Sequence, residues 1–145
     1  MEKAQTYANH KMFVPVFHFG VAPILLVNAV WSVWQLFRTE LTFERVLAAL
    51  VALAIFGAVF YGRQFVLVVQ NRVIRLEMWL RLARVLPPDL AARVPELRTG
   101  QLIALRFASD AELPELVRQV LDQGIRSQDE IKRRVRDWQP DHLRC

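Results

Sequence analysis

Two long apolar segments dominate the first half of the chain. Residues 13–36 carry no charged side chain, and an α-helix of that length, at about 1.5 Å per residue, is longer than the roughly 30 Å hydrocarbon core of a bilayer. Residues 46–69 form the second segment, which is uncharged up to Gly62 and resumes its apolar pattern after Arg63 and Gln64. The short connection between the segments predicts an antiparallel pair of transmembrane helices.

The two segments have alternative interpretations. A pair of buried core helices is one, but a chain of 145 residues has too little other protein to cover two helices that are apolar on every side. A cleaved signal peptide is another, but the first segment is too long and no small-residue cleavage site follows it. Membrane insertion is therefore the favoured interpretation, with the polar residues 1–12 as an interfacial segment at the headgroup level.

The basic residues near the segment ends predict the orientation in the membrane, because Lys and Arg are retained on the cytoplasmic side. Two of them precede the first segment, two lie in the connection and four follow the second segment: Lys3 and Lys11; Arg38 and Arg45; Arg72, Arg75, Arg81 and Arg84. We therefore expect both termini in the cytoplasm.

The second segment continues beyond the expected membrane as an amphipathic helix. Apolar residues recur there at alternating steps of three and four, the heptad spacing that keeps one face against a partner helix: Val66, Val69, Val73, Leu76, Leu80 and Ala83. This heptad stripe is widened by Ile74, Met78, Leu82 and Val85. We expect residues 70–86 to form a cytoplasmic extension that ends before Pro87 and Pro88, because proline cannot continue a helix. The stripe packs either on the C-terminal helices of the same chain or on a second copy.

Residues 87–145 predict a small helical subdomain. Short helices are expected at 90–94 and 99–107, and a third helix, ending at Gly124, carries the apolar face Leu113, Leu116, Val117, Val120 and Leu121. Ser109 with Glu112, and Ser127 with Glu130, have the spacing of capping boxes. The second box opens a last helix whose apolar face is Ile131, Val135 and Trp138.

The predicted fold class is therefore an all-α membrane protein. Residues 13–69 form an antiparallel two-helix transmembrane hairpin, whose second helix extends into the cytoplasm. A small helical C-terminal subdomain follows over residues 87–145.

Four polar side chains interrupt the first apolar segment at a spacing that places them on one helix face: His18, Asn28, Ser32 and Gln35. Polar groups are costly in lipid and point at a neighbouring helix or a water-filled path. We favour hydrogen bonding between helices as the role of this polar seam, and an oligomeric pore lined by it is the alternative.

The second segment carries small residues that allow close helix packing, in small-xxx-small spacing: Ala48, Ala52, Ala54, Ala58 and Gly62. Near its end, Arg63 is expected to extend toward lipid phosphates. Arg72 and Arg75 are further basic residues of the expected membrane interface.

No catalytic, cofactor or metal site is predicted. Cys145 is the single cysteine and has no disulfide partner, and the three histidines, His10, His18 and His142, lack acidic or thiolate ligands at helical spacing. No nucleophile has an evident base, and the sequence has no glycine-rich phosphate loop. We therefore interpret the chain as non-enzymatic.

A basic run lies on the second helix of a helix-turn-helix outline near the C-terminus: Lys132, Arg133, Arg134 and Arg136. Such a run is a candidate patch for nucleic acid or anionic lipid. Helix pairs with a glycine turn are also common in protein cores, and the formal net charge of +5 is modest. Nucleic acid is therefore the least favoured partner.

Four segments together resemble a family of small bacterial two-helix membrane proteins, the domain of unknown function 6526: TYANHKMFVPVFHF, QNRVIRLEMWLRLARVLP, QLIALRFASDAELPELV and EIKRRVRDWQPDHLR. The resemblance covers residues 6–144 and implies a bacterial membrane location with two spans. It implies no catalytic residue. We expect a non-enzymatic inner-membrane protein that acts through oligomerisation or partner binding, its partners being lipids, further copies of itself or a cytoplasmic protein.

Overall fold

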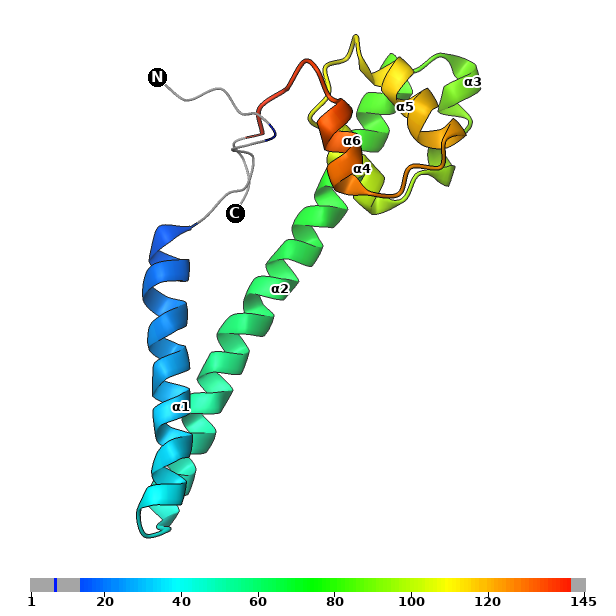
Figure 1. The fold of residues 1–145 in the computed structure, drawn as a ribbon. Coiled ribbons are helices and arrows are strands. Elements are labelled where there is room, and N and C mark those ends of the chain that lie inside the picture. Colours follow the sequence, from blue (N-terminus) through cyan, green and yellow to red (C-terminus); the bar gives the residue numbers. More distant parts are fainter. Residues whose placement is uncertain (1–6, 8–13, 142–145) are drawn as a thin grey trace. The chain divides into compact units, whose positions relative to one another are not determined.

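The computed structural model describes Tyr7 and residues 14–141, which are mainly helical (Figure 1). The elements are η1 (Val16–Val21), α1 (Ala22–Arg38), α2 (Phe43–Val85), α3 (Pro88–Ala91), η2 (Val94–Glu96), α4 (Thr99–Leu105), α5 (Leu113–Asp122) and α6 (Gln128–Arg134). The described residues contain no strand, so the all-α prediction is confirmed. The predicted interfacial segment 1–12, Tyr7 apart, lies outside the described residues, as do His10, His142 and Cys145.

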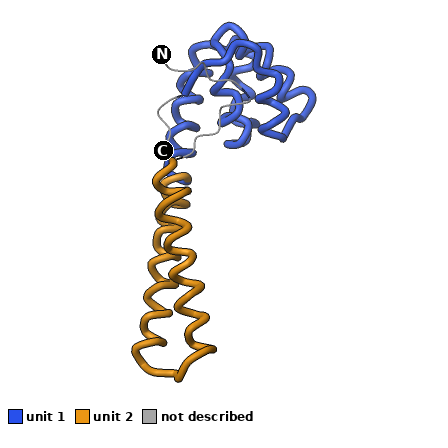
Figure 2. Tube along the Cα trace, turned by 60° about the vertical axis from the view of Figure 1, so that its left-hand side comes forward, with its two compact units in different colours: residues 1–12, 68–144 blue, residues 13–67, 145 orange. Residues whose placement is uncertain are grey.

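The chain divides into two compact units (Figure 2). Unit 1 consists of Met1–Met12 and Val68–Arg144, and unit 2 consists of Phe13–Leu67 and Cys145. The long helix α2 contributes its first half to unit 2 and its second half to unit 1.

Unit 2 contains η1, α1 and the first half of α2. The helical stretches Val16–Arg38 and Phe43–Val85 are both long and apolar enough to cross a membrane. Their most apolar parts are only 6% and 11% buried, whereas the core helix of a soluble domain would be mostly buried. The residues of this unit that are buried are small: Ala29 on α1, and Ala49 and Ala52 on α2.

The first helix departs from α geometry just before Pro23. Residues Val16–Val21 form a π-helical turn, and the amide of Ala22 donates to the carbonyl of Phe17, five residues earlier. Pro23 has no amide hydrogen to donate, and its ring crowds the carbonyl four residues before it. A π-helical turn is a common way for a helix to accommodate such a disturbance.

Unit 1 is built around one apolar core. Helices α3, α4, α5 and α6 gather around the C-terminal part of α2 (Figure 1). That part of α2, together with Leu86 directly after it, contributes a core stripe of Ile74, Met78, Leu82 and Leu86. The predicted apolar face of α5 is confirmed, since Leu113, Leu116, Val117 and Val120 are buried and Leu121 is half-buried.

The helix ends of unit 1 follow local chemistry in some places only. The Ser127 hydroxyl accepts from the amide of Glu130 at 3.4 Å, as predicted. The capping box predicted for Ser109 and Glu112 is wrong, because α5 begins at Leu113 without a side-chain cap. The Glu112 carboxylate instead accepts from the amides of Arg136 and Asp137. The helix predicted at 90–94 is also wrong, since it falls across α3 and η2.

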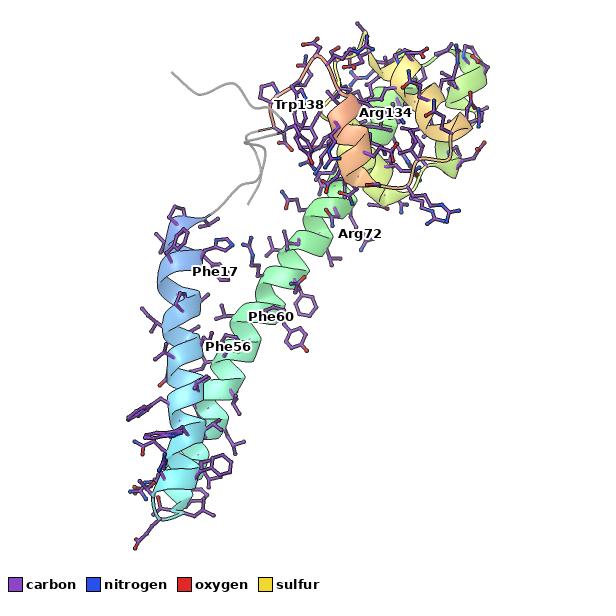
Figure 3. The ribbon with its side chains drawn as sticks, in the orientation of Figure 1. Phe17, Phe56, Phe60, Arg72, Arg134 and Trp138 are labelled. Carbon is purple, nitrogen blue, oxygen red and sulfur yellow. The ribbon has the colours of Figure 1, made fainter. Side chains whose placement is uncertain are left out.

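The last helix is shorter than the apolar periodicity predicts. It ends at Arg134, so Val135 and Trp138 lie beyond it. Trp138 is placed instead by an isolated antiparallel bridge with Ala108, in which the Gln139 amide donates to the Phe107 carbonyl at 2.7 Å. The rings of Trp138 and Phe107 are 4.9 Å apart. Figure 3 shows Trp138 on the segment that follows α6.

Candidate functional site

The four residues of the predicted polar seam differ in their surroundings. His18, Ser32 and Gln35 are half-buried, whereas Asn28 is exposed. Asn28 lies along a shallow groove on α1 with Pro23, Ile24, Val27 and Trp31. The half-buried face of α1 runs instead through Leu25, Ala29, Ser32 and Leu36.

His18 contacts the residues just before it in the chain. Its Nδ1 atom is 2.9 Å from the carbonyl oxygen of Val14 and 3.2 Å from the Val14 amide nitrogen. Its ring also packs edge-on against Phe17, with ring centroids 5.2 Å apart. These local contacts give the imidazole polar partners at the start of the apolar segment.

Arg63 finds an aromatic partner within unit 2. Its guanidinium lies over the ring of Phe17, 4.9 Å from the centroid, and the side chain is half-buried. A guanidinium over an aromatic face is a favourable cation–π contact, which strengthens where water is excluded. Phe17 is labelled on the first helix in Figure 3.

The other two predicted interface cations lie on the second half of α2. The Arg75 guanidinium stacks over Trp79 at 4.6 Å from the ring centroid. Arg72, labelled in Figure 3, is exposed, and among the described residues its side chain has no ion-pair or hydrogen-bond partner.

The four cations of the predicted basic patch do not form one free surface. Lys132 is buried, with its ammonium 5.8 Å from the centroid of Phe107. Arg134 donates to Gln123 at 2.7 Å and to Glu130 at 2.9 Å. The side chain of Arg136 is exposed.

Arg133 contacts Tyr7, which also belongs to unit 1. Its Nε donates to the Tyr7 hydroxyl at 3.2 Å, and this hydrogen bond raises the pKa of Arg133 above its ordinary value. The guanidinium also lies 5.4 Å from the centroid of the Tyr7 ring. Arg133 therefore ties Tyr7 to α6.

An open cleft of about 900 Å³ lies between α5 and the chain from α6 onward. Its charged lining mixes both signs: Glu112, Glu115, Arg133, Arg134, Arg136 and Asp137. A nucleic-acid surface requires a positive field over many phosphates. The mixed charges of this cleft therefore suit ion pairs within the protein better than binding of nucleic acid.

Sequence reasoning missed the structural role of two arginines. Arg81 contacts the chain between α4 and α5 through three hydrogen bonds, and Arg106 pairs with Asp141 at 3.0 Å while packing over Phe107. Both are long-range contacts, so no local pattern indicates them. Among the described residues, no group of three or more His, Cys, Asp or Glu side chains is placed to hold a metal ion.

The heptad stripe predicted on α2 divides into two faces. Ile74, Met78 and Leu82 are buried in the core of unit 1. Val85 is half-buried against that core. The other members in unit 1 form an exposed stripe of Val69, Val73, Leu76, Leu80 and Ala83. At about 100° per residue, the exposed stripe and the core stripe lie on opposite sides of the helix, about 180° apart.

The exposed stripe is a strong candidate for an interaction surface of unit 1. Val69, Leu76 and Leu80 are 59%, 58% and 68% exposed, and Val73 is 47% exposed. Contiguous apolar side chains on a protein surface mark contacts with protein or membrane.

Comparisons with known proteins give a family but no function. No curated protein and no solved structure matches the chain. A family of unknown function matches residues 1–145, the whole of the chain. The protein therefore belongs to that family, DUF6526, as the four sequence segments indicated.

Proposed function

We propose that the protein is a two-pass component of the bacterial inner membrane that acts by assembly and partner binding rather than by catalysis. In this proposal unit 2 is an antiparallel transmembrane hairpin, and both termini are cytoplasmic. Unit 1 is then a helical module that meets partners at the cytoplasmic surface.

The observation that carries the proposal is the continuity of α2. This single helix runs from Phe43 to Val85 and supplies both the more apolar of the two candidate spans and Ile74, Met78 and Leu82 of the core stripe of unit 1. The helical module therefore includes the end of a candidate spanning helix in its own core. Such a module would form at the membrane surface wherever the first half of α2 is inserted.

Small buried residues support the hairpin. Ala29, Ala49 and Ala52 are 4%, 2% and 3% exposed, in a unit whose larger apolar side chains are mostly exposed. Helices in lipid associate through close backbone approach at small residues, because lipid supplies no hydrophobic driving force between them. The cation–π contact of Arg63 with Phe17 adds a polar partner between α2 and η1.

The basic residues support the orientation. Arg72, Arg75, Arg81 and Arg84 all follow the apolar part of α2, and basic residues near span ends are retained on the cytoplasmic side. The anionic cytoplasmic leaflet attracts such residues by about 1 kcal/mol each near its surface.

The polar seam and the basic patch remain alternatives to assembly. A pore would need all four seam residues to face a common path, and Asn28 is exposed along a groove with Val27 and Trp31, whereas Ser32, one turn later, is half-buried. Nucleic acid would need free cations, and Lys132 and Arg134 are engaged within unit 1. Neither alternative gains an observation that favours it over assembly.

The first test is the mass of the full chain reconstituted in lipid nanodiscs, after confirming that it resists alkaline extraction from membranes. We expect a discrete oligomer, on the order of two to four copies. Extraction at high pH would overturn the membrane proposal, and a monomer at all lipid-to-protein ratios would overturn assembly.

Orientation is tested by membrane-impermeant thiol labelling of single cysteines in a Cys145→Ser background. Thr39→Cys, in the connection between α1 and α2, should react in intact spheroplasts, and Asp122→Cys on α5 should react only after lysis. The reverse pattern would overturn the cytoplasmic assignment of unit 1.

A further inference from the structure

We propose that α2 pairs in parallel with α2 of a second copy through the exposed stripe, with Arg72 of each copy against Glu77 of the other. The proposal deepens the proposed function and rests on it, because insertion in one membrane gives both copies the same direction. It names the partner of the exposed stripe as a second copy of this chain and fixes the register of the pair.

The geometry of the stripe is that of a coiled-coil seam. Its members alternate in steps of four and three from Val69 to Ala83, which is the a and d pattern of a left-handed coiled coil. With Val73 and Leu80 at a, the residues Val69, Leu76 and Ala83 fall at d. A β-branched residue at a followed by leucine at d, as in Val73 and Leu76, favours two strands in a parallel pair.

The stripe is available to a second copy. The side of α2 that packs in unit 1 is the opposite one, where Met78 and Leu82 are 3% and 0% exposed. The folded module therefore leaves the a and d positions outside its own core. Pairing would bury Val69, Val73, Leu76 and Leu80 without rearranging unit 1.

Charge complementarity identifies the second copy as the occupant. In a parallel pair, a g residue meets the e residue five positions later on the other helix. In this register Arg72 is at g and Glu77 is at e, so the two copies form this opposite-charge pair twice. Among the described residues neither side chain has an ion-pair or hydrogen-bond partner within its own chain.

The next pair along the seam is also complementary. Trp79 is at g and Arg84 is at e, so a guanidinium of one copy would reach the indole of the other, the best aromatic partner for a cation. Trp79 already accepts the guanidinium of Arg75 on one side and is 39% exposed.

A lipid surface fits the stripe less well than a second copy does. An amphipathic helix on an anionic leaflet is rich in Lys and Arg on its polar face. One flank of the exposed stripe carries Glu77 between Gln70 and Arg84, and an anionic surface would repel the Glu77 carboxylate. A second copy of α2, which places its Arg72 opposite Glu77, explains why an acidic residue stands at this position.

The seam is short, so pairing through it depends on the membrane. Fewer than three heptads separate Val69 from Ala83, so the pair would be weak between free copies in solution. Insertion of both copies in one bilayer aligns the helices and raises their effective concentration, which makes a weak contact effective.

Disulfide formation tests the face and the direction. In the full chain with Cys145→Ser, reconstituted in liposomes, Leu76→Cys places the two sulfurs on the seam of a parallel pair. Mild oxidation should convert most of this variant to a disulfide dimer. The matched control Asn71→Cys is exposed and lies on the opposite side of α2, so it should stay monomeric under the same conditions. Equal cross-linking of both variants, or of neither, would overturn the proposal.

Charge exchange tests the register. Arg72→Glu or Glu77→Arg alone places like charges opposite each other twice, and each should lower the association constant in lipid by about tenfold or more. The double variant restores opposite charges and should return the constant to within about threefold of the original. A double variant as weak as the single ones would rule out this pairing.

The two levels of the proposal fail differently. If the chain forms an oligomer whose mass is unchanged by every seam variant and Leu76→Cys does not cross-link, assembly occurs through other surfaces and only the seam is wrong. If the original chain is monomeric in lipid, both the seam and the proposed assembly are wrong. Capture of lipid or of another protein on the stripe, without a second copy, would also overturn the seam.

Discussion

The Nε of Arg81 on α2 donates to the Oδ1 of Asp110, 2.6 Å away in the turn that precedes α5. The same guanidinium donates to the carbonyl oxygens of Arg106 at 3.0 Å and Ala108 at 2.7 Å. One side chain therefore satisfies the backbone of the α4–α5 connection and attaches it to the long helix. The two parts of the interaction differ in exposure, because Asp110 is largely exposed and Arg81 is not.

Replacing Arg81 by alanine should destabilise unit 1 by about 1–3 kcal/mol, because two carbonyl groups lose their donor. Asp110→Asn should cost less than about 1 kcal/mol, since it removes only the exposed ion pair. Pulse proteolysis of the full chain in nanodiscs at increasing urea gives both values. Equal losses in the two variants would mean that the ion pair, and not the carbonyl contacts, carries the stability.

Truncation of two neighbouring leucines on α2 should affect the stability of unit 1 very differently. Leu82 is fully buried, so Leu82→Ala should lower the free energy of unfolding of unit 1 by about 2–5 kcal/mol. Leu80 is 68% exposed, so Leu80→Ala should change that free energy by no more than about 0.5 kcal/mol.

Self-association in lipid should instead be more sensitive to Leu80→Ala than to Leu82→Ala. Leu80→Ala should weaken it, because Leu80 belongs to the exposed stripe. Urea titration and light scattering of each variant provide the two readouts. Loss of folding stability in Leu80→Ala would show that the stripe is part of the core of unit 1.

The turn after α5 depends on a glycine. Gly124 has a φ of 61°, and its amide and that of Ile125 donate to the carbonyls of Leu121 and Val120, which closes the C-terminus of the helix. Gly124→Ala should destabilise unit 1 by about 1 kcal/mol, because a side chain disfavours this conformation. Gly124→Asn should cost less, since asparagine tolerates it.

Hydrogen exchange of the Ile125 amide reports on this turn directly. We expect faster exchange in Gly124→Ala than in Gly124→Asn. Gly20→Ala is the control: apart from the adjacent residues and the helix's own backbone, nothing lies within 4 Å of an added Cβ there, and Gly20 has no positive φ. Unchanged protection at Ile125 in the alanine variant would contradict the role of the glycine.

Helix packing in unit 2 is tested by enlarging one alanine. Ala49 is 2% exposed, so Ala49→Leu should force the helices apart and destabilise unit 2 by about 1–3 kcal/mol. The neighbouring Ala48 is exposed, and Ala48→Leu should be nearly neutral. Thermal unfolding in mild detergent compares the two. Equal effects of both substitutions would indicate that Ala49 does not lie against a partner helix.

Features that depend on a few adjacent residues could be predicted from the sequence. Ser127 caps α6 because its hydroxyl needs only an amide three residues away, and Gly124 ends α5 because a positive φ suits glycine. The long helix through Val85 followed from its apolar spacing and from the prolines after it. In each case the partner atoms lie on the same stretch of chain.

Features that depend on distant partners could not be predicted. The apolar residues of α2 beyond Val66 cover most of its circumference, so the pattern could not decide which side enters the core. Trp138 has helical spacing from Ile131 and Val135, yet it reaches the core through the bridge with Ala108. The basic run predicts a surface cation at Lys132, but the residue is buried and its ammonium lies near Phe107.

The bridge between Ala108 and Trp138 also determines where the folded module ends. The chain beyond Arg134 is not helical, yet its backbone closes on Phe107 and Ser109, and its indole covers the Phe107 ring. A polypeptide stopped at the last helical residue would leave that ring and the neighbouring carbonyl uncovered. The smallest autonomous form of unit 1 must therefore retain Trp138 and Gln139, and a reporter fused at Arg134 would disrupt the module it is meant to report on.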